Sequence, residues 1–322
     1  MTESSNRSST SKDKAKSQSR TVGNPKGQRA ITKPQKSNTN LYTWGLITLV
    51  VVIVAGLVVW KITSKPAKVK DLGAAPASIV DPVTSIPASV FDQVGATGYD
   101  TQFPANPYLA TKGQPLIKFA DTSGARKPGI LYNGAEYCPY CAAERWALIA
   151  GLSRFGTFKG LGLTTSGAQD VYAGTNTFTF TNATYTSPYV TFQSIENYTN
   201  QENSSGTGYV PLQTPTTAQA ALITKYDNPP FVPSQAAGGF PFILYAGQVI
   251  APGSTFNPQV LGGLTWKEIS SQLNDSSVPA TQDIVASATY VSAAVCHIDG
   301  DKPADVCMSS GVKAAKKAIG IS

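Results

Sequence analysis

Two cysteines separated by two residues, Cys138 and Cys141, have a spacing that allows covalent redox chemistry. The residues between them are Pro139 and Tyr140, and a short apolar run at 130–132 precedes the motif. A helical pattern follows, so we expect Cys138 at a helix N-terminus, where free N–H groups and the helix dipole stabilise a thiolate. Cys141 then lies on the same helical face, close enough to close a disulfide or to resolve a mixed one. Pro139 suits the first helical turn because its missing N–H has no partner there.

The same spacing also occurs in zinc half-sites and in short structural disulfides. A zinc site would need a second ligand pair, but the remaining cysteines, Cys296 and Cys307, are eleven positions apart and form no second motif of this kind. The single histidine, His297, excludes most triad hydrolases and histidine-based metal sites. We therefore predict no metal and no cofactor, and a structural staple stays open as the alternative to redox chemistry.

Strand and helix patterns alternate between residues 86 and 275, and they position the motif. The run at 130–132 predicts a strand, and the apolar spacing over 142–155 predicts a helix. Residues 160–215 are rich in Thr, Asn, Ser and Tyr, which is typical of exposed strands and loops. Residues 242–245 are apolar and predict a buried strand. The pattern indicates an α/β domain with a β-rich insertion.

Pro241 precedes the strand at 242–245. Proline is permitted at the start of a strand, and a cis bond is a typical reason for keeping one there. An ordinary trans peptide bond between Phe240 and Pro241 is the alternative.

These elements, with a further helix at 266–273, resemble the thioredoxin fold, in which a cis-proline loop lies against the active-site disulfide. The segment 132–158, YNGAEYCPYCAAERWALIAGLSRFGTF, resembles a family of membrane-anchored prokaryotic proteins catalogued as a domain of unknown function with a thioredoxin-like core. The resemblance extends from about residue 85 to the C-terminus. It implies that Pro241 is the cis-proline and that the backbone of Phe240 pairs with a substrate polypeptide.

One position departs from the thioredoxin pattern. Thioredoxins place a buried Asp six residues before the first active-site cysteine, where this chain has Tyr132. Glu136 matches a more exposed position and is a candidate proton acceptor for Cys141; a solvated surface carboxylate is the alternative. Without the buried base, we expect disulfide donation or exchange outside the cell rather than efficient reduction.

Two further helices, at 284–297 and 305–319, are predicted to form a C-terminal hairpin. Cys296 and Cys307 flank its turn. In an oxidising compartment their pairing would contribute about 2–4 kcal/mol to stability in the chain-entropy model. The alternative is a shuttle disulfide that exchanges electrons with the first pair, with His297 lowering the pKa of the adjacent thiol.

The N-terminal residues predict an anchor. Residues 1–40 hold nine Lys or Arg and two acidic residues, which accounts for the whole net charge of +7, so we predict a disordered basic tail and no nucleic-acid domain. Residues 41–60 contain no charge and would span about 30 Å as a helix, which predicts a transmembrane segment with a cytoplasmic N-terminus. Residues 61–85 are predicted to be a stalk linker.

The predicted fold class is therefore α/β: a thioredoxin-like domain at 86–275 on a single transmembrane helix, with a β-rich insertion and a C-terminal helical hairpin at 276–322. The predicted function is a membrane-tethered extracytoplasmic thiol-disulfide oxidoreductase acting on exported protein thiols and disulfides. Membrane lipid at 41–60 and a membrane redox protein are the other expected partners. The alternative is a non-catalytic surface binding or structural module on the same scaffold.

Overall fold

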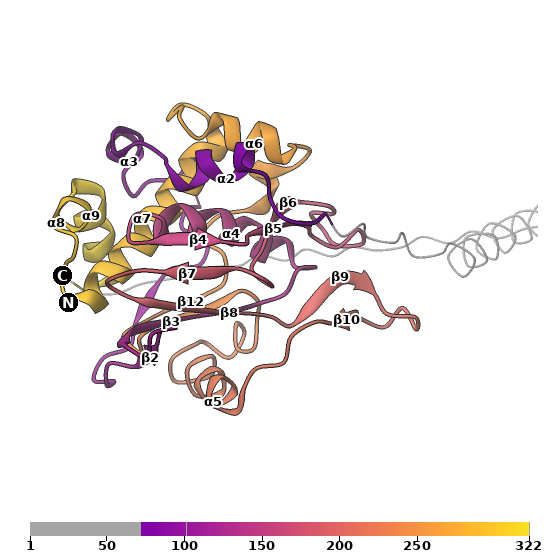
Figure 1. Cartoon of the computed structure of the whole chain (residues 1–322), viewed down its shortest axis with the longest axis horizontal. Helices are drawn as coiled ribbons and strands as arrows, with labels where there is room; N and C mark the ends of the chain where they lie inside the picture. The colour runs from indigo at the N-terminus through magenta and orange to yellow at the C-terminus, as the bar shows by residue number, and fades with distance from the viewer. Residues whose placement is uncertain (1–71, 101, 322) are drawn as a thin grey trace, which may run out of the picture. The chain divides into compact units, whose positions relative to one another are not determined.

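A mixed sheet of six strands forms the centre of the computed structural model, which describes residues 72–100 and 102–321 (Figure 1). Five strands run in the order β1-β12-β11-β3-β2, and β8 also pairs with β3. Their bounds are Leu109–Ala110 (β1), Val249–Pro252 (β12), Phe242–Tyr245 (β11), Arg126–Gly134 (β3), Lys118–Ala120 (β2) and Thr191–Glu196 (β8). Only β8 is parallel to β3, and the other pairs are antiparallel.

The central strands β3 and β11 divide their side chains between two cores. Successive residues of a strand point to opposite faces, so Tyr132 and Ile243 join the larger core while Leu131 and Leu244 join a smaller one. Both strands are fully buried where they pair, which explains why their sequences are continuous apolar runs instead of alternating ones.

Helices cover the face of the larger core. Two long ones, α4 (Pro139–Leu152) and α7 (Pro279–Asp299), pack against each other and are buried almost all round. The shorter ones on this side are α2 (Ala77–Thr84), α3 (Ala88–Val94), α6 (Trp266–Gln272), α8 (Ala304–Cys307), α9 (Ser310–Ile319) and the 3-10 turn η1 (Pro258–Leu261). The opposite face carries α5 (Thr217–Tyr226), which covers the smaller core through Tyr226 (Figure 1).

The segment between α4 and α5 contains the polar strands expected there. Its antiparallel pairs are β4 (Thr157–Lys159) with β7 (Thr184–Thr186), β5 (Gly162–Thr165) with β6 (Asn176–Thr179), and β9 (Tyr198–Glu202) with β10 (Tyr209–Pro211). β8 follows β7 directly and returns the chain to the main sheet.

The transmembrane helix is the part of the predicted fold class that has to be corrected. Across residues 72–100 and 102–321, no helix is both long enough and apolar enough to cross a membrane. The longest helix of this part, α7, spans 21 residues but carries polar groups such as Gln282 and Asp283 and packs in the core. The span predicted at 41–60, like the basic tail before it, lies outside the described residues.

Two element boundaries also differ from the sequence-based expectation. Helix α2 lies within the stretch predicted as a stalk, and it folds there because Ile79 and Val83 are buried in the larger core. The second helix of the C-terminal hairpin is divided into α8 and α9, because Ser309 adopts an extended conformation between them.

Candidate functional site

The CPYC motif lies where the central strand gives way to helix α4. Strand β3 ends at Gly134, and Cys138 is the N-cap residue of α4 with an extended backbone. The backbone N–H of Cys141 donates to Cys138 Sγ over 3.3 Å, so the sulfur takes the place that a capping oxygen usually occupies. Pro139 occupies the first turn, as the sequence predicts.

The two thiols of the motif differ in their electrostatics. The interaction with the Cys141 thiol lowers the pKa of Cys138, against the opposing effect of burial. Burial raises the pKa of Cys141 well above its ordinary value, and Cys138 adds to the shift. Cys138 is 6% exposed and Cys141 has no exposed surface. The geometry therefore fits one slightly exposed thiol that ionises more readily and one fully buried partner thiol.

The proline loop lies against the first cysteine. The Phe240–Pro241 peptide bond is cis, and Cys138 Sγ donates to the carbonyl oxygen of Phe240 over 3.6 Å. Strand β11 begins at the next residue, Phe242, and its register against Asn133 sets the loop beside the end of β3. The structure thus brings Phe240 and Pro241 to the CPYC motif from a hundred residues away in the chain.

The other predicted supporting residues have different positions. Tyr140 is 37% exposed and packs edge-on against Tyr172 at 6.0 Å between ring centroids. Glu136 is half-buried, and burial raises its pKa. Its carboxylate approaches Thr181 Oγ1 at 3.5 Å, so its observed hydrogen bond is to the insertion and not to Cys141.

Tyrosines from the insertion extend the rim of the site. The ring of Tyr137, next to the first cysteine, stacks on that of Tyr209 at 4.0 Å and also packs near Tyr198 at 6.1 Å. Sequence reasoning noted the Tyr-rich composition of the insertion but did not assign these residues to the site. They give the rim flat apolar faces together with hydroxyl groups.

A buried ion pair behind the motif was missed from the sequence. Arg145, one helical turn after Cys141, donates to Glu196 through Nε over 2.8 Å and through Nη2 over 2.7 Å. Nη2 also donates to the carbonyl of Ala135 over 2.8 Å. Both charged side chains are fully buried, which is rare without such pairing. The available signal was a pair of charged residues, Glu144 and Arg145, in an otherwise mostly apolar helical stretch.

Tyr132 completes this buried region. It has no exposed surface, and its ring packs edge-on against Phe180 at 5.2 Å. A Cβ at Gly134 would lie 2.2 Å from the Tyr132 hydroxyl and 3.0 Å from Cys141 Sγ, so both atoms border the same small space. Among the described residues, this hydroxyl has no hydrogen-bond acceptor or donor. Position 132, six residues before Cys138, is therefore occupied by a buried phenol that borders the same space as the second thiol.

The C-terminal cysteines are joined. Cys296 and Cys307 form a disulfide with 5.6 Å between their Cα atoms, linking α7 to α8. Asp301 lies near them and completes the one trio of potential metal ligands within the described part of the chain. Because both sulfurs are bonded to each other, they are not available as thiolate ligands. Burial and the charge of Lys316 lower the pKa of His297, which follows Cys296.

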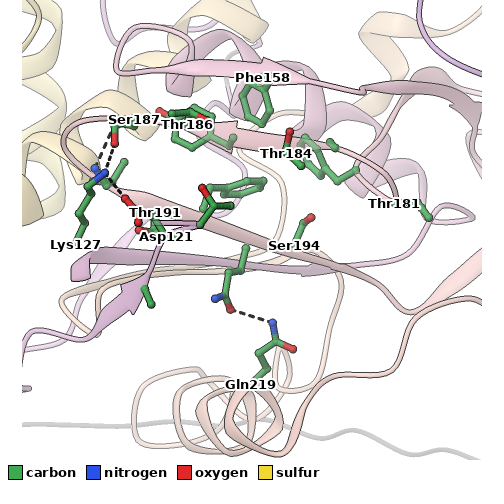
Figure 2. Close-up of a pocket in the computed structure, with 18 of the residues that line it drawn as sticks. Asp121, Lys127, Phe158, Thr181, Thr184, Thr186, Ser187, Thr191, Ser194 and Gln219 are labelled. Atoms are coloured by element: carbon green, nitrogen blue, oxygen red, sulfur yellow. Dashed lines mark hydrogen bonds and ion pairs between the residues drawn. The ribbon is translucent and has the colours of Figure 1, made fainter. Parts of the chain in front are cut away.

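A cavity of about 340 Å³ opens on the side of β8 that does not pair with β3 (Figure 2). Its lining combines aromatic rings with hydroxyl and amide groups, and its one ion pair joins Lys127 to Asp121 over 2.7 Å. Gln219 of α5 donates to Gln193 over 3.0 Å across one end. Phe180 lines the cavity and also packs on Tyr132, so one ring separates the cavity from the buried region behind Cys141. No cysteine contributes to this lining.

Comparison with known proteins identifies a family. No curated protein and no solved structure shows a significant match to the chain. A family model described as Domain of unknown function (DUF929) matches residues 117–297, a segment that takes in the CPYC motif, the insertion and the proline loop. Because the match covers more than half of the chain, the protein belongs to the DUF929 family.

Proposed function

We propose that the protein is a thiol-disulfide oxidoreductase that acts on exported proteins, with Cys138 as the nucleophile and Cys141 as the resolving thiol. The observation that carries the proposal is the helix-capping position of Cys138, whose sulfur accepts the N–H of Cys141 and faces the carbonyl of Phe240. A thiolate at such a helix terminus is the usual nucleophile of this chemistry.

The sheet order supports a thioredoxin-like core as part of the same proposal. Strands β12, β11, β3 and β8 lie side by side, with β8 parallel to β3 and the other neighbours antiparallel. Helix α4 follows β3 and begins with the motif, while the cis Phe240–Pro241 bond precedes β11. This arrangement agrees with the fold that the sequence resembles.

The proposed reaction is a reversible two-step exchange. When a substrate disulfide is reduced, Cys138 is the attacking thiolate and Cys141 the resolving thiol, and disulfide donation runs in the opposite direction. A substrate thiolate attacks Cys138 Sγ of the Cys138–Cys141 disulfide, and that bond breaks with its electron pair on Cys141, which then takes up a proton. A second substrate thiolate attacks the substrate sulfur of the mixed disulfide and releases Cys138 as a thiolate. The substrate loses two electrons and gains a disulfide, and the motif becomes a dithiol. A disulfide-bearing partner takes up these two electrons when the motif is reoxidised.

A location outside the cytoplasm is also proposed. The Cys296–Cys307 disulfide supports it, because such bonds persist in oxidising compartments and are rare in the cytosol.

A non-catalytic binding module is the second candidate. It is favoured by the neutral cavity beside β8, whose aromatic rings and hydroxyl groups suit an uncharged ligand (Figure 2). In this case the CPYC motif would act only as a local staple.

Trapping of mixed disulfides separates the two candidates. In Cys141→Ala, Cys138 can attack a substrate disulfide but the group that expels the substrate is absent, so adducts with exported proteins should accumulate at least several-fold above wild type. Cys138→Ala is the matched control and should trap far less, because Cys141 is fully buried. Non-reducing gels and mass spectrometry measure the adducts. A folded Cys141→Ala protein with no more adducts than wild type would favour the binding module.

A further inference from the structure

Two buried hydrogen-bond donors without partners lie around Cys141. Within the described residues, the Tyr132 hydroxyl and Nη1 of Arg145 have no acceptor, although neither side chain has any exposed surface. Buried polar groups are nearly always bonded, and each exception calls for an explanation. Here the two exceptions belong to one region, because the Arg145 guanidinium lies 5.9 Å from the centre of the Tyr132 ring.

The Tyr132 hydroxyl is placed to contact the second thiol. A Cβ added at Gly134 would touch both the hydroxyl and Cys141 Sγ, at 2.2 and 3.0 Å. Burial raises the pKa of Tyr132 well above its ordinary value, despite the opposing charge of Arg145, so the phenol keeps its proton. A phenol that keeps its proton is a donor, and the form of Cys141 that accepts most strongly is the thiolate.

The positive charge of Arg145 acts on the same atom. Burial disfavours the ionised form of Cys141, and the guanidinium one helical turn away offsets part of that cost by lowering the pKa. Glu196 holds two of the guanidinium nitrogens, Nε and Nη2, and leaves Nη1 unpaired. The ion pair therefore keeps a charge inside the core and fixes its position behind the motif.

We infer that Tyr132 and Arg145, with Glu196 holding the arginine, form a thiolate-stabilising cluster for Cys141 that does the work of the aspartate absent from position 132. The inference rests on the proposed function and deepens it. When a substrate thiolate attacks Cys138, the breaking disulfide bond leaves its electron pair on Cys141 Sγ. The hydroxyl of Tyr132 donates to this sulfur, and Arg145 offsets its negative charge. Tyr132 keeps its own proton, and the proton that later neutralises Cys141 comes from water.

Tyr132→Phe is the sharpest variant, because it removes one hydroxyl for which the described part of the dithiol chain offers no hydrogen-bond partner. Loss of a hydrogen bond to a thiolate should make formation of that thiolate less favourable by about tenfold. Because Cys141 carries only part of the negative charge in the transition state, the rate of disulfide reduction should change by about threefold. Reduction of the oxidised chain by glutathione at pH 7 should therefore slow by about threefold. Ser287→Ala is the matched control, since it removes another buried hydroxyl without a partner, on α7, and should leave the rate unchanged.

A second measurement reports on Cys141 without requiring oxidoreductase activity. In a Cys138→Ala chain, Cys141 is the one remaining free thiol, because Cys296 and Cys307 are bonded to each other. Its rate of reaction with the small reagent methyl methanethiosulfonate at pH 8 depends on access and on its thiolate fraction, so two chains with equal access differ in rate through the thiolate fraction. Adding Tyr132→Phe should lower this rate by about threefold. In a Cys141→Ala chain, the same change should leave the reaction of Cys138 unaltered.

Arg145 and Glu196, the two charged residues of the cluster, are tested together. Arg145→Met with Glu196→Gln removes both charges at once and leaves no unpaired ion in the core. This double variant should also slow both reactions of Cys141 by about threefold or more. Circular dichroism confirms that each variant keeps the wild-type fold.

The outcomes separate the cluster from the proposed function. A wild-type chain in which no Cys138–Cys141 disulfide can be formed and reduced would overturn the proposed function, and the methanethiosulfonate rates would still decide on the cluster. The cluster would be overturned if the Tyr132→Phe variant and the Arg145→Met, Glu196→Gln double variant fold normally and react at Cys141 within 1.5-fold of their parent chains, as Ser287→Ala is expected to do. Slower reaction of Cys141 with unchanged Cys138 supports it.

Discussion

Cys138 and Cys141 are free thiols at a strand-to-helix junction, whereas Cys296 and Cys307 are bonded to each other at the end of α7. Around the first pair lie a buried ion pair, a carbonyl from the proline loop and a phenol that has no hydrogen-bond partner among residues 72–100 and 102–321. The second pair belongs to the larger apolar core together with its neighbours.

The two pairs therefore differ in the surroundings of their sulfur atoms as well as in their spacing in the sequence. Near Cys141 the fold retains polar groups that favour a negative sulfur, although burial disfavours it. Cys307 and its chain neighbour Val306 are both buried in the larger apolar core, so a thiolate there would find little stabilisation. Under the proposed function, we therefore expect reversible chemistry at the first pair and a permanent bond at the second.

Of the differences that we predict between the two cysteine pairs, the largest is in the reduction potentials of their disulfides. In a titration of the full chain against glutathione, Cys138–Cys141 should be reduced at the mild potentials of catalytic pairs, between about −120 and −270 mV. Cys296–Cys307 should stay oxidised, as structural disulfides below about −300 mV do. If the two reduction potentials differ by about 90 mV, the equilibrium constants for reduction of the two disulfides by glutathione differ by about a thousandfold.

Mass spectrometry after alkylation shows which cysteines have been reduced. If both pairs are reduced together, or Cys296–Cys307 first, the comparison fails and a shuttle between the pairs is favoured. The single change Cys141→Ser provides the control, since it should abolish the first transition and leave the second in place.

Removal of the second pair should affect stability but not reactivity. The disulfide closes a loop with a sequence separation of 11, so Cys296→Ala with Cys307→Ala should cost about 3 kcal/mol in free energy of unfolding. Urea denaturation measures this cost. The glutathione titration of Cys138–Cys141 should be the same as in wild type, and a changed first transition would show that the two regions are coupled.

The sequence predicts the parts of the site that depend on local patterns. The CPYC motif, the strand before it and the helix after it are set by apolar periodicity and helix-terminus chemistry, and α4 and β11 lie close to the predicted positions. Pro241 is signalled by its place at the start of an apolar strand. In the structure it lies beside Cys138, where the thioredoxin resemblance places it.

Other parts depend on distant partners and leave little trace in the sequence. Arg145 and Glu196 are 51 residues apart, and their pairing depends on the parallel register of β8 beside β3. In the sequence, Tyr132 shows only that the aspartate of thioredoxins is absent. Its hydroxyl is found to border the same space as Cys141 Sγ only in the structure. The transmembrane prediction was wrong as part of the fold class, because no helix of the described chain meets the length and hydropathy that a membrane span requires.

The free energy of unfolding should depend on pH between 7 and 9 through a group near the first cysteine pair and not through one near the second. We expect this to be the smallest of the predicted effects. Glu144, on α4 near Cys141, is fully buried, and burial raises its pKa to about 8. Its Oε2 accepts from the backbone and hydroxyl of Thr255 over 3.2 and 3.3 Å. By contrast, burial raises the pKa of Asp299, beside the second pair, only to about 6, so Asp299 is already ionised across this range.

The sign follows from the folded pKa of Glu144 being above its unfolded value. The unfolded chain has already lost this proton at pH 7, whereas the folded chain loses it only as the pH passes about 8. The contribution of Glu144 to the free energy of unfolding therefore falls by about 1 kcal/mol between pH 7 and 9.

Glu144→Gln keeps an oxygen that can accept from Thr255 and removes the titrating carboxyl. The free energy of unfolding of this variant should therefore fall less than that of wild type over this pH range. The variant lacking Cys296 and Cys307 should keep the wild-type pH dependence, because a disulfide does not titrate. Urea denaturation at pH 7, 8 and 9 measures all three proteins, and equal slopes for Glu144→Gln and wild type would contradict the assignment of this pH dependence to α4.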